Sequence, residues 1–217
     1  MDKFECWLPS WDYLHNSCKK IVKKMEEKDY RPDIAVALSR GGYVPARIIC
    51  DMMIIKDLVS IKVDHWGITA AKDGQVKIRY PLSSDLTGKK VLVVDDITDT
   101  GKSMIASKAY LKSLNPKDIK TATALHISSS EFEPDYFGEK IEWKWVIFPW
   151  NYMEDMCTLV PKVLEEKNSK NIDEIRNGLK ENFKIDINGD SVLEILGKLE
   201  REKIVASYRE GWLKVKP

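Results

Sequence analysis

Short apolar runs alternate with stretches in which apolar residues recur every three or four positions. The runs predict buried strands at 33–38, 59–63, 91–94, 121–127 and 144–148. Helical spacing predicts helices at 10–28, 45–53 and 103–114. In the first helix one face collects Trp11, Leu14, Cys18, Ile21, Val22 and Met25. The alternation of strand and helix favours an α/β fold with a mostly parallel five-stranded sheet flanked by helices.

The pattern changes after Trp150. Residues 153–167, 172–183 and 191–203 have helical spacing, and 204–215 reads as a two-stranded ribbon. We therefore expect two domains, a main domain at 1–150 and a small helical module at 151–217. Residues 67–85 are polar and irregular, which predicts a long mobile loop that could contain a weak hairpin, or else a plain surface loop.

Charge and composition exclude several classes of protein. The 217 residues contain 35 Lys+Arg and 34 Asp+Glu, so no excess of positive charge favours binding to nucleic acid or to a membrane surface. The apolar runs are too short to cross a bilayer, and the first residues lack the pattern of a signal peptide. The four cysteines are scattered, without a CxxC pair. These features predict a cytoplasmic protein without a zinc site or a disulfide framework.

The stretch VLVVDDITDTGKSM, residues 91–104, carries the clearest chemistry. A buried strand runs into two adjacent carboxylates, Asp95 and Asp96, and then into a Thr-Gly turn that opens a helix. A strand, a glycine loop and a helix N-terminus together direct backbone N–H groups at an anion. Carboxylates accept hydrogen bonds from sugar hydroxyls and bind magnesium. The stretch therefore predicts a site for a phosphorylated sugar.

The same stretch closely resembles the signature of type I phosphoribosyltransferases, which bind 5-phosphoribosyl-1-pyrophosphate (PRPP). Two further stretches agree with this resemblance, in the same order along the chain. LSRGGYVPA, at 38–46, resembles the pyrophosphate loop of the 6-oxopurine members, in particular the xanthine-guanine enzymes. WVIFPW, at 145–150, is similar to the purine-binding segment of those members. The resemblance covers about the first 150 residues and implies the type I phosphoribosyltransferase fold.

The resemblance also implies a role for each matching residue. Asp99 would be the catalytic residue, facing N7 of the purine, and 67–85 would be the lid. Asp95 and Asp96 would bind the ribose and, together with PRPP, Mg²⁺ as the cofactor. The pyrophosphate would be held by Ser39, Arg40 and Gly41, with a strained or cis peptide between the last two. The 5′-phosphate would be bound by Thr98, Thr100, Gly101, Lys102 and Ser103. The purine would be bound by Ile97, Ser128, Trp145, Val146 and Phe148.

The base pocket departs from the family pattern. The 6-oxopurine enzymes carry a lysine after the fourth core strand, where its ammonium donates to O6 of the base. No lysine lies between Lys120 and Lys140, and the matching position is Ser128. A serine hydroxyl can accept from an exocyclic amine. The departure predicts adenine as the base, with AMP and pyrophosphate as products, in an enzyme resembling an archaeal-type adenine phosphoribosyltransferase. We expect His126 to be structural.

Two alternatives remain open. One is a hypoxanthine, guanine or xanthine phosphoribosyltransferase with the same chemistry. The other is a transcriptional regulator that senses PRPP and binds DNA through 151–217. Against the regulator, 151–217 holds 12 Lys+Arg and 13 Asp+Glu, and all three motif aspartates are present. Relatives are commonly dimers, so a homodimer that contacts neither nucleic acid nor membrane is expected.

Overall fold

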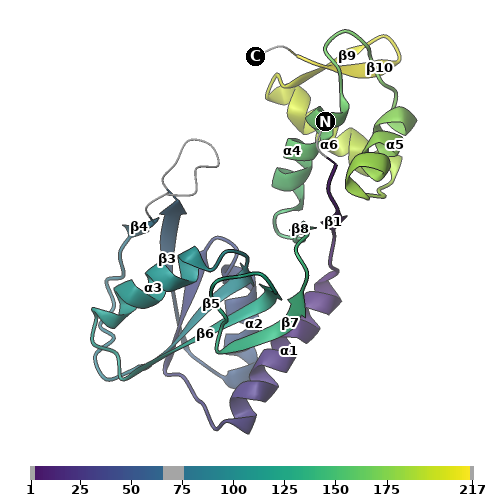
Figure 1. Cartoon of the computed structure of the whole chain (residues 1–217). Coiled ribbons are helices and arrows are strands. Elements are labelled where there is room, and N and C mark those ends of the chain that lie inside the picture. Colours follow the sequence, from purple (N-terminus) through teal and green to yellow (C-terminus); the bar gives the residue numbers. More distant parts are fainter. Residues whose placement is uncertain (1–2, 66–75, 216–217) are drawn as a thin grey trace. The chain divides into compact units, whose positions relative to one another are not determined.

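The chain forms two compact units in the computed structural model, which describes residues 3–65 and 76–215 (Figure 1). One unit is residues 11–143, and the other joins residues 1–10 to residues 144–217. These boundaries differ from the expected division at residue 150, because Phe4, Cys6 and Leu8 near the N-terminus pack in one core with the C-terminal helices. The functional division at residue 150 stays a prediction.

The unit of residues 11–143 is an α/β sheet structure. Its elements are, in chain order, α1 (Trp11–Glu27), β2 (Ile34–Ser39), α2 (Tyr43–Met53), β3 (Asp57–His65), β4 (Val76–Tyr80), β5 (Lys90–Thr98), α3 (Lys102–Lys112), β6 (Asp118–Ile127) and β7 (Tyr136–Ile141). The strand order is β4-β3-β2-β5-β6-β7. Only the β3–β4 pair is antiparallel. This confirms the predicted α/β class with a mostly parallel sheet.

Helices cover both faces of this sheet. Ala37, Leu92 and Val94 pack under α1 and α2, which contribute Ile21, Met25 and Ile49 among others. The alternate residues of the same strands pack on the other face with Met104 and Leu111 of α3. Strands buried on both faces explain the continuous apolar runs in the sequence. Trp11 was predicted on the core face of α1, but it is the first residue of the helix and is 55% exposed. Ser17, which was not predicted there, is buried on that face.

The sheet has six strands instead of five. Residues 145–146 were expected in the last strand, but they form a short strand of the other unit. The edge strand next to β6 is β7 instead. The prediction missed β7 because it is an edge strand with one neighbour, and its outer positions are filled by polar residues such as Glu139 and Lys140. Part of the predicted 67–85 loop, 66–75, lies outside the described residues; the strand β4 lies within its second half.

The second unit contains the predicted helices and ribbon. Its elements are β1 (Cys6–Trp7), β8 (Trp145–Val146), α4 (Tyr152–Val163), α5 (Ile172–Phe183), α6 (Gly189–Arg201), β9 (Val205–Tyr208) and β10 (Gly211–Lys214). β1 pairs in parallel with β8, and β9 pairs antiparallel with β10. One core joins the three helices, and Phe183 is fully buried in it. Within the part of the chain that is described, no helix has the length and apolar character that a membrane span needs.

Candidate active site

Three neighbouring strands bring most of the predicted site residues to one edge of the sheet. β2, β5 and β6 are adjacent and parallel, so their carboxyl ends meet at this edge. Ser39 ends β2, Arg40 and Gly41 follow it, and residues 95–103 span the end of β5 and the start of α3. Ser128 follows β6. Ligands of open α/β sheets bind at such an edge, and the sequence motifs thus converge there.

The loop between β2 and α2 lies against the end of β5. A Cβ atom added to Gly41 would stand 2.1 Å from Oδ2 of Asp96, so only a glycine lets the loop approach this carboxylate so closely. A Cβ on Gly42 would stand 2.3 Å from the carbonyl oxygen of Val94. The two glycines therefore allow contact between the predicted pyrophosphate loop and the predicted ribose-binding strand end. The cis peptide of this loop joins Ser39 to Arg40, one residue earlier than expected.

Tyr43 adds a contact that the sequence analysis did not include. Its hydroxyl accepts a hydrogen bond from Ser39 Oγ at 3.0 Å and lies 3.0 Å from Ser60 Oγ. These two hydrogen bonds lower the pKa of the Tyr43 phenol. Tyr43 thereby ties the loop after β2 to the neighbouring strand β3. No sequence pattern indicates this contact, because Ser60 lies 17 residues further along the chain.

The two carboxylates at the end of β5 differ in their surroundings. Asp96 is 9% exposed and faces Gly41. Burial raises the pKa of the Asp95 carboxyl well above its usual range, and the negative charge of Asp96 adds to the rise. The Asp96 N–H partly offsets this by donating to Asp95 Oδ1 at 3.0 Å. Two close carboxylates of this kind are stabilised when a cation or several hydroxyl groups bind beside them.

Replacing Asp95 with asparagine is expected to stabilise the free protein at neutral pH while weakening PRPP binding. Because the pKa of Asp95 is higher in the folded protein, its protonated form favours folding. This contribution to stability is fully present below the usual pKa of 3.8, and it is lost as the pH rises through the raised pKa. At neutral pH Asp95 therefore lowers the free energy of unfolding, and asparagine, which has nearly the same shape and does not ionise, removes this cost. Thermal unfolding at pH 7 and at acidic pH measures the gain, which should shrink on acidification. A lower melting temperature at pH 7 contradicts the electrostatic account.

The loop after β5 forms a sharp turn into α3. Gly101 has φ +85°, a left-handed conformation that favours glycine, and it directly precedes the helix. A Cβ on Gly101 would stand 2.4 Å from Cβ of Phe132 and 3.1 Å from Oγ of Ser130. The turn after β6 thus packs directly on the predicted phosphate loop. Phe132 and Ser130 are therefore supporting residues that the motif search missed, because they lie about 30 residues further along the chain.

The hydroxyl and carboxyl groups of this loop are not equally accessible. Asp99 and Thr100 are exposed, and Thr100 Oγ1 accepts a hydrogen bond from the Lys102 N–H at 3.4 Å. Thr98 is only 3% exposed, and its Oγ1 donates to Thr123 Oγ1 at 3.2 Å. To contact a phosphate, the Thr98 hydroxyl would have to exchange this partner. The individual roles assigned to these residues stay predictions.

The end of β6 holds the position predicted to contact the base. Ser128 N–H donates to the carbonyl oxygen of Ile141 at 2.8 Å, which fixes the backbone at this strand end. His126 is 1% exposed, and its Nδ1 has no hydrogen-bond partner among the described residues. Burial lowers the pKa of His126, and the charge of Lys140 lowers it further. The buried ring packs against Phe137 in a tilted arrangement, with ring centroids 5.1 Å apart. The structural role expected for His126 stays a prediction.

Three predicted purine-binding residues belong to the other unit, and only their surroundings within it are described. Trp145 is 38% exposed, and its Nε1 donates to Asp155 Oδ1 at 3.2 Å. Phe148 is 4% exposed and stacks on Trp150, with ring centroids 4.9 Å apart. Val146 lies in the short strand β8. Their contacts with a base, and that of Ile97 at the end of β5, stay predictions.

The donor atoms at the end of β5 fit a magnesium ion only in part. Asp95 and Asp96 offer the carboxylate oxygens that Mg²⁺ prefers. Among the described residues, however, no group of three or more acidic, histidine or cysteine side chains is arranged to hold a metal ion. Mg²⁺ bound here would therefore need further oxygen ligands, and PRPP or water can supply them.

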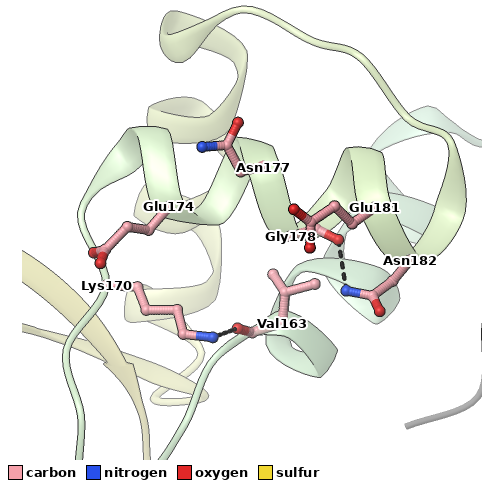
Figure 2. Close-up of a pocket in the computed structure, with 7 residues that line it drawn as sticks. All are labelled: Val163, Lys170, Glu174, Asn177, Gly178, Glu181 and Asn182. Carbon is pink, nitrogen blue, oxygen red and sulfur yellow. Dashed lines mark hydrogen bonds between the residues drawn. The ribbon is translucent and has the colours of Figure 1, made fainter.

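A separate pocket lies in the second unit and does not carry this chemistry. It has a volume of about 330 Å³ and is lined by polar side chains along α5 (Figure 2). The Lys170 ammonium donates to the carbonyl oxygen of Val163 at 2.8 Å, and Asn182 Nδ2 donates to the carbonyl oxygen of Gly178 at 2.7 Å. Neither a phosphate loop nor an adjacent pair of aspartates faces this pocket among its lining residues.

The fold and the edge of the sheet together define an α/β protein with a glycine turn at the start of a helix, beside two adjacent carboxylates. The family model of the phosphoribosyl transferase domain matches residues 10–155. Since this match covers more than half of the chain, the chain belongs to the phosphoribosyl transferase family. Helices α5 and α6 and the terminal ribbon lie outside the match.

Several relatives share this domain. The xanthine-guanine phosphoribosyltransferase of Desulfotalea psychrophila is 30% identical over 145 residues, which are 65% of this chain and 84% of that protein. The xanthine-guanine phosphoribosyltransferase of Idiomarina loihiensis is 28% identical over 143 residues, which are again 65% of this chain and 84% of that protein. The crystal structure of a purine phosphoribosyltransferase from Pyrococcus horikoshii matches with a TM-score of 0.60 and 28% identity, covering 67% of this chain and 93% of that one.

Proposed function

We propose that this protein transfers the phosphoribosyl group of PRPP to N9 of a purine base, with release of pyrophosphate. The observation that carries the proposal is the close approach of Gly41 to Asp96, which brings the loop after β2 against the end of β5. The loop after β2 would bind the leaving pyrophosphate, and the end of β5 would bind the ribose. The displacement separates charge between a cationic sugar and a polyanion, so a site of this kind must hold both groups at once.

Asp99 would act as the proton acceptor or charge stabiliser at N7 of the base. It is exposed at the loop that leads into α3, so a substrate can reach it. Magnesium, when bound with PRPP, would neutralise charge on the pyrophosphate. The residues of this chain then have the tasks of binding, orienting and accepting a proton. A homodimer stays a prediction.

For the base, we propose a 6-oxopurine, which is xanthine, guanine or hypoxanthine. The names of the curated relatives support this class. The missing lysine is compatible with it, because a serine hydroxyl donates as well as accepts, so Ser128 can donate to O6. Adenine is the second candidate. It is favoured by the lysine-free segment 121–139, since the same hydroxyl can accept from a 6-amino group.

A competition assay tests the base class. Equal concentrations of adenine, hypoxanthine, guanine and xanthine are incubated with limiting PRPP and Mg²⁺, and the nucleotide products are separated. We expect the 6-oxopurine nucleotides to dominate. AMP as the main product would establish the second candidate and reject the first. The absence of every nucleotide product would reject the transferase activity itself.

Variants at Ser128 then test the base contact. Ser128→Ala should lower kcat/KM for the preferred base by about tenfold, the cost of one lost hydrogen bond in a buried site. Ser128→Lys should raise the use of hypoxanthine relative to adenine. Ser129→Ala is the matched control, because it removes a neighbouring hydroxyl without changing the residue at the strand end. Equal effects of the two alanine variants would show that Ser128 does not contact the base.

A further inference from the structure

A second pocket lies at the opposite edge of the sheet from the candidate active site. It has a volume of about 370 Å³ and lies between the last turns of α3 and the start of β6. Its lining contains four lysines and one acid: Lys108, Lys112, Lys117, Lys120 and Asp118. Because β6 begins here and ends at the candidate active site, the two places share no residue. We refer to these lining residues as the lysine pocket.

Two of the lysines are held in place by one half-buried carboxylate, that of Asp135. Asp135 Oδ1 accepts from Lys120 Nζ at 3.1 Å, and Asp135 Oδ2 lies 3.8 Å from Lys108 Nζ. The same carboxylate accepts from Thr121 N–H at 2.9 Å and from Thr121 Oγ1 at 2.8 Å, so its position is fixed. The hydrogen bond to Asp135 raises the pKa of Lys120. This side of the pocket is therefore preorganised and stays positively charged.

The other two lysines have no such partner. Lys112 and Lys117 are exposed, and the ammonium group of neither makes a hydrogen bond or an ion pair with any described residue. A lysine ammonium in the last turn of a helix interacts favourably with the negative end of the helix dipole. This explains the presence of Lys112, the last residue of α3. It does not account for Lys117 or Lys120, which follow the helix. Asp135 compensates part of the charge of Lys108 and Lys120. Lys112 and Lys117 therefore leave an excess of positive charge at the pocket, which a bound anion would balance.

We propose that the lysine pocket binds a small anion that carries two or more phosphate groups. Lysine ammoniums act as point charges toward phosphate oxygens. Four lysines against two acids, Asp118 in the lining and Asp135 beside it, leave a net charge of about +2, which matches an anion with two or more phosphate groups better than a single carboxylate. The volume falls in the range of pockets for small ligands. A nucleoside diphosphate and free pyrophosphate share this chemistry. This binding goes beyond the proposed transferase function, since it uses none of its residues.

Titration calorimetry of the full chain with pyrophosphate, ADP and adenosine tests the proposal. Pyrophosphate and ADP also fit the candidate active site, so each titration is repeated in a Lys102→Ala background. The pocket variant is Lys112→Gln with Lys117→Gln. The control is Lys19→Gln with Lys56→Gln, which removes two exposed lysines elsewhere and changes the net charge equally.

We expect the pocket variant to weaken one binding event by about tenfold or more in both backgrounds, and the control to leave it unchanged. Adenosine should not bind there. Similar affinities for pyrophosphate and ADP would show that the phosphates alone are recognised, and tighter ADP binding would show that the nucleoside contributes. Equal binding by the pocket variant and the control overturns the proposal. Since this result depends on Lys112 and Lys117 alone, it is distinguishable from a failure of the transferase activity.

Discussion

Replacing Asp99 with asparagine is expected to lower kcat by about a hundredfold or more while PRPP still binds. A proton acceptor placed at the reacting group typically contributes a factor of this size. Asp99 is exposed at the turn before α3, so the nearly isosteric asparagine should leave the fold intact. The glycine turn at Gly101 also remains. Steady-state kinetics, together with the dissociation constant of PRPP measured by calorimetry, separate the two effects.

The matched control is Asp51→Asn. Asp51 lies on α2, and its carboxylate forms an exposed ion pair with Arg47, with a 3.4 Å distance between Nη2 and Oδ1. Such surface pairs contribute little to stability. The control should therefore keep both kcat and PRPP affinity. If Asp99→Asn turns over at the rate of this control, Asp99 has no role in the chemical step.

Gly41→Ala is expected to lower kcat/KM by about a hundredfold. The added Cβ would stand 2.1 Å from Oδ2 and 2.6 Å from Oδ1 of Asp96, far inside any normal contact. Either the loop after β2 or the Asp96 carboxylate must move by about 1 Å, and a displacement of that size at a reacting centre costs about two orders of magnitude. The crowding should also lower the free energy of unfolding by about 1–3 kcal/mol. Kinetics and denaturant unfolding measure the two losses.

Gly197→Ala provides the control for this substitution. Gly197 lies in α6, and a Cβ there would meet no atom within 4 Å. Alanine should stabilise this helix by about 0.5–1 kcal/mol and leave kcat/KM unchanged. Normal activity of Gly41→Ala would show that the reaction does not need the close approach of the loop to Asp96. This approach would then no longer support the proposed function.

The local elements of the fold were largely predictable from the sequence. Helix α5 begins and ends at the predicted residues, and the other helices differ from the prediction by only a few residues at each end. The glycine turn after β5 was predictable for the same reason, because strand, turn and helix are neighbours along the chain. Its binding of a phosphate stays a prediction. Patterns of this kind report a local preference of the backbone, and they need no knowledge of distant residues.

The arrangement of distant segments was decided by tertiary structure. The apolar residues of 145–148 predicted a strand of the main sheet, but Ile147 and Phe148 are buried in the other unit. The polar edge strand β7 takes the sixth place in the sheet. Both segments can form strands, so the choice depends on which core each one packs against, and periodicity does not contain that information.

For the site, the sequence by itself determined which residue types stand at the strand ends. It did not determine that Gly41 faces Asp96, that Tyr43 bonds to Ser39 and Ser60, or that Phe132 packs on Gly101. These contacts depend on β2, β3, β5 and β6 being neighbours in one parallel sheet. Strand order is set by the burial of both sheet faces under helices, which is a property of the whole unit, so only the tertiary structure could decide it.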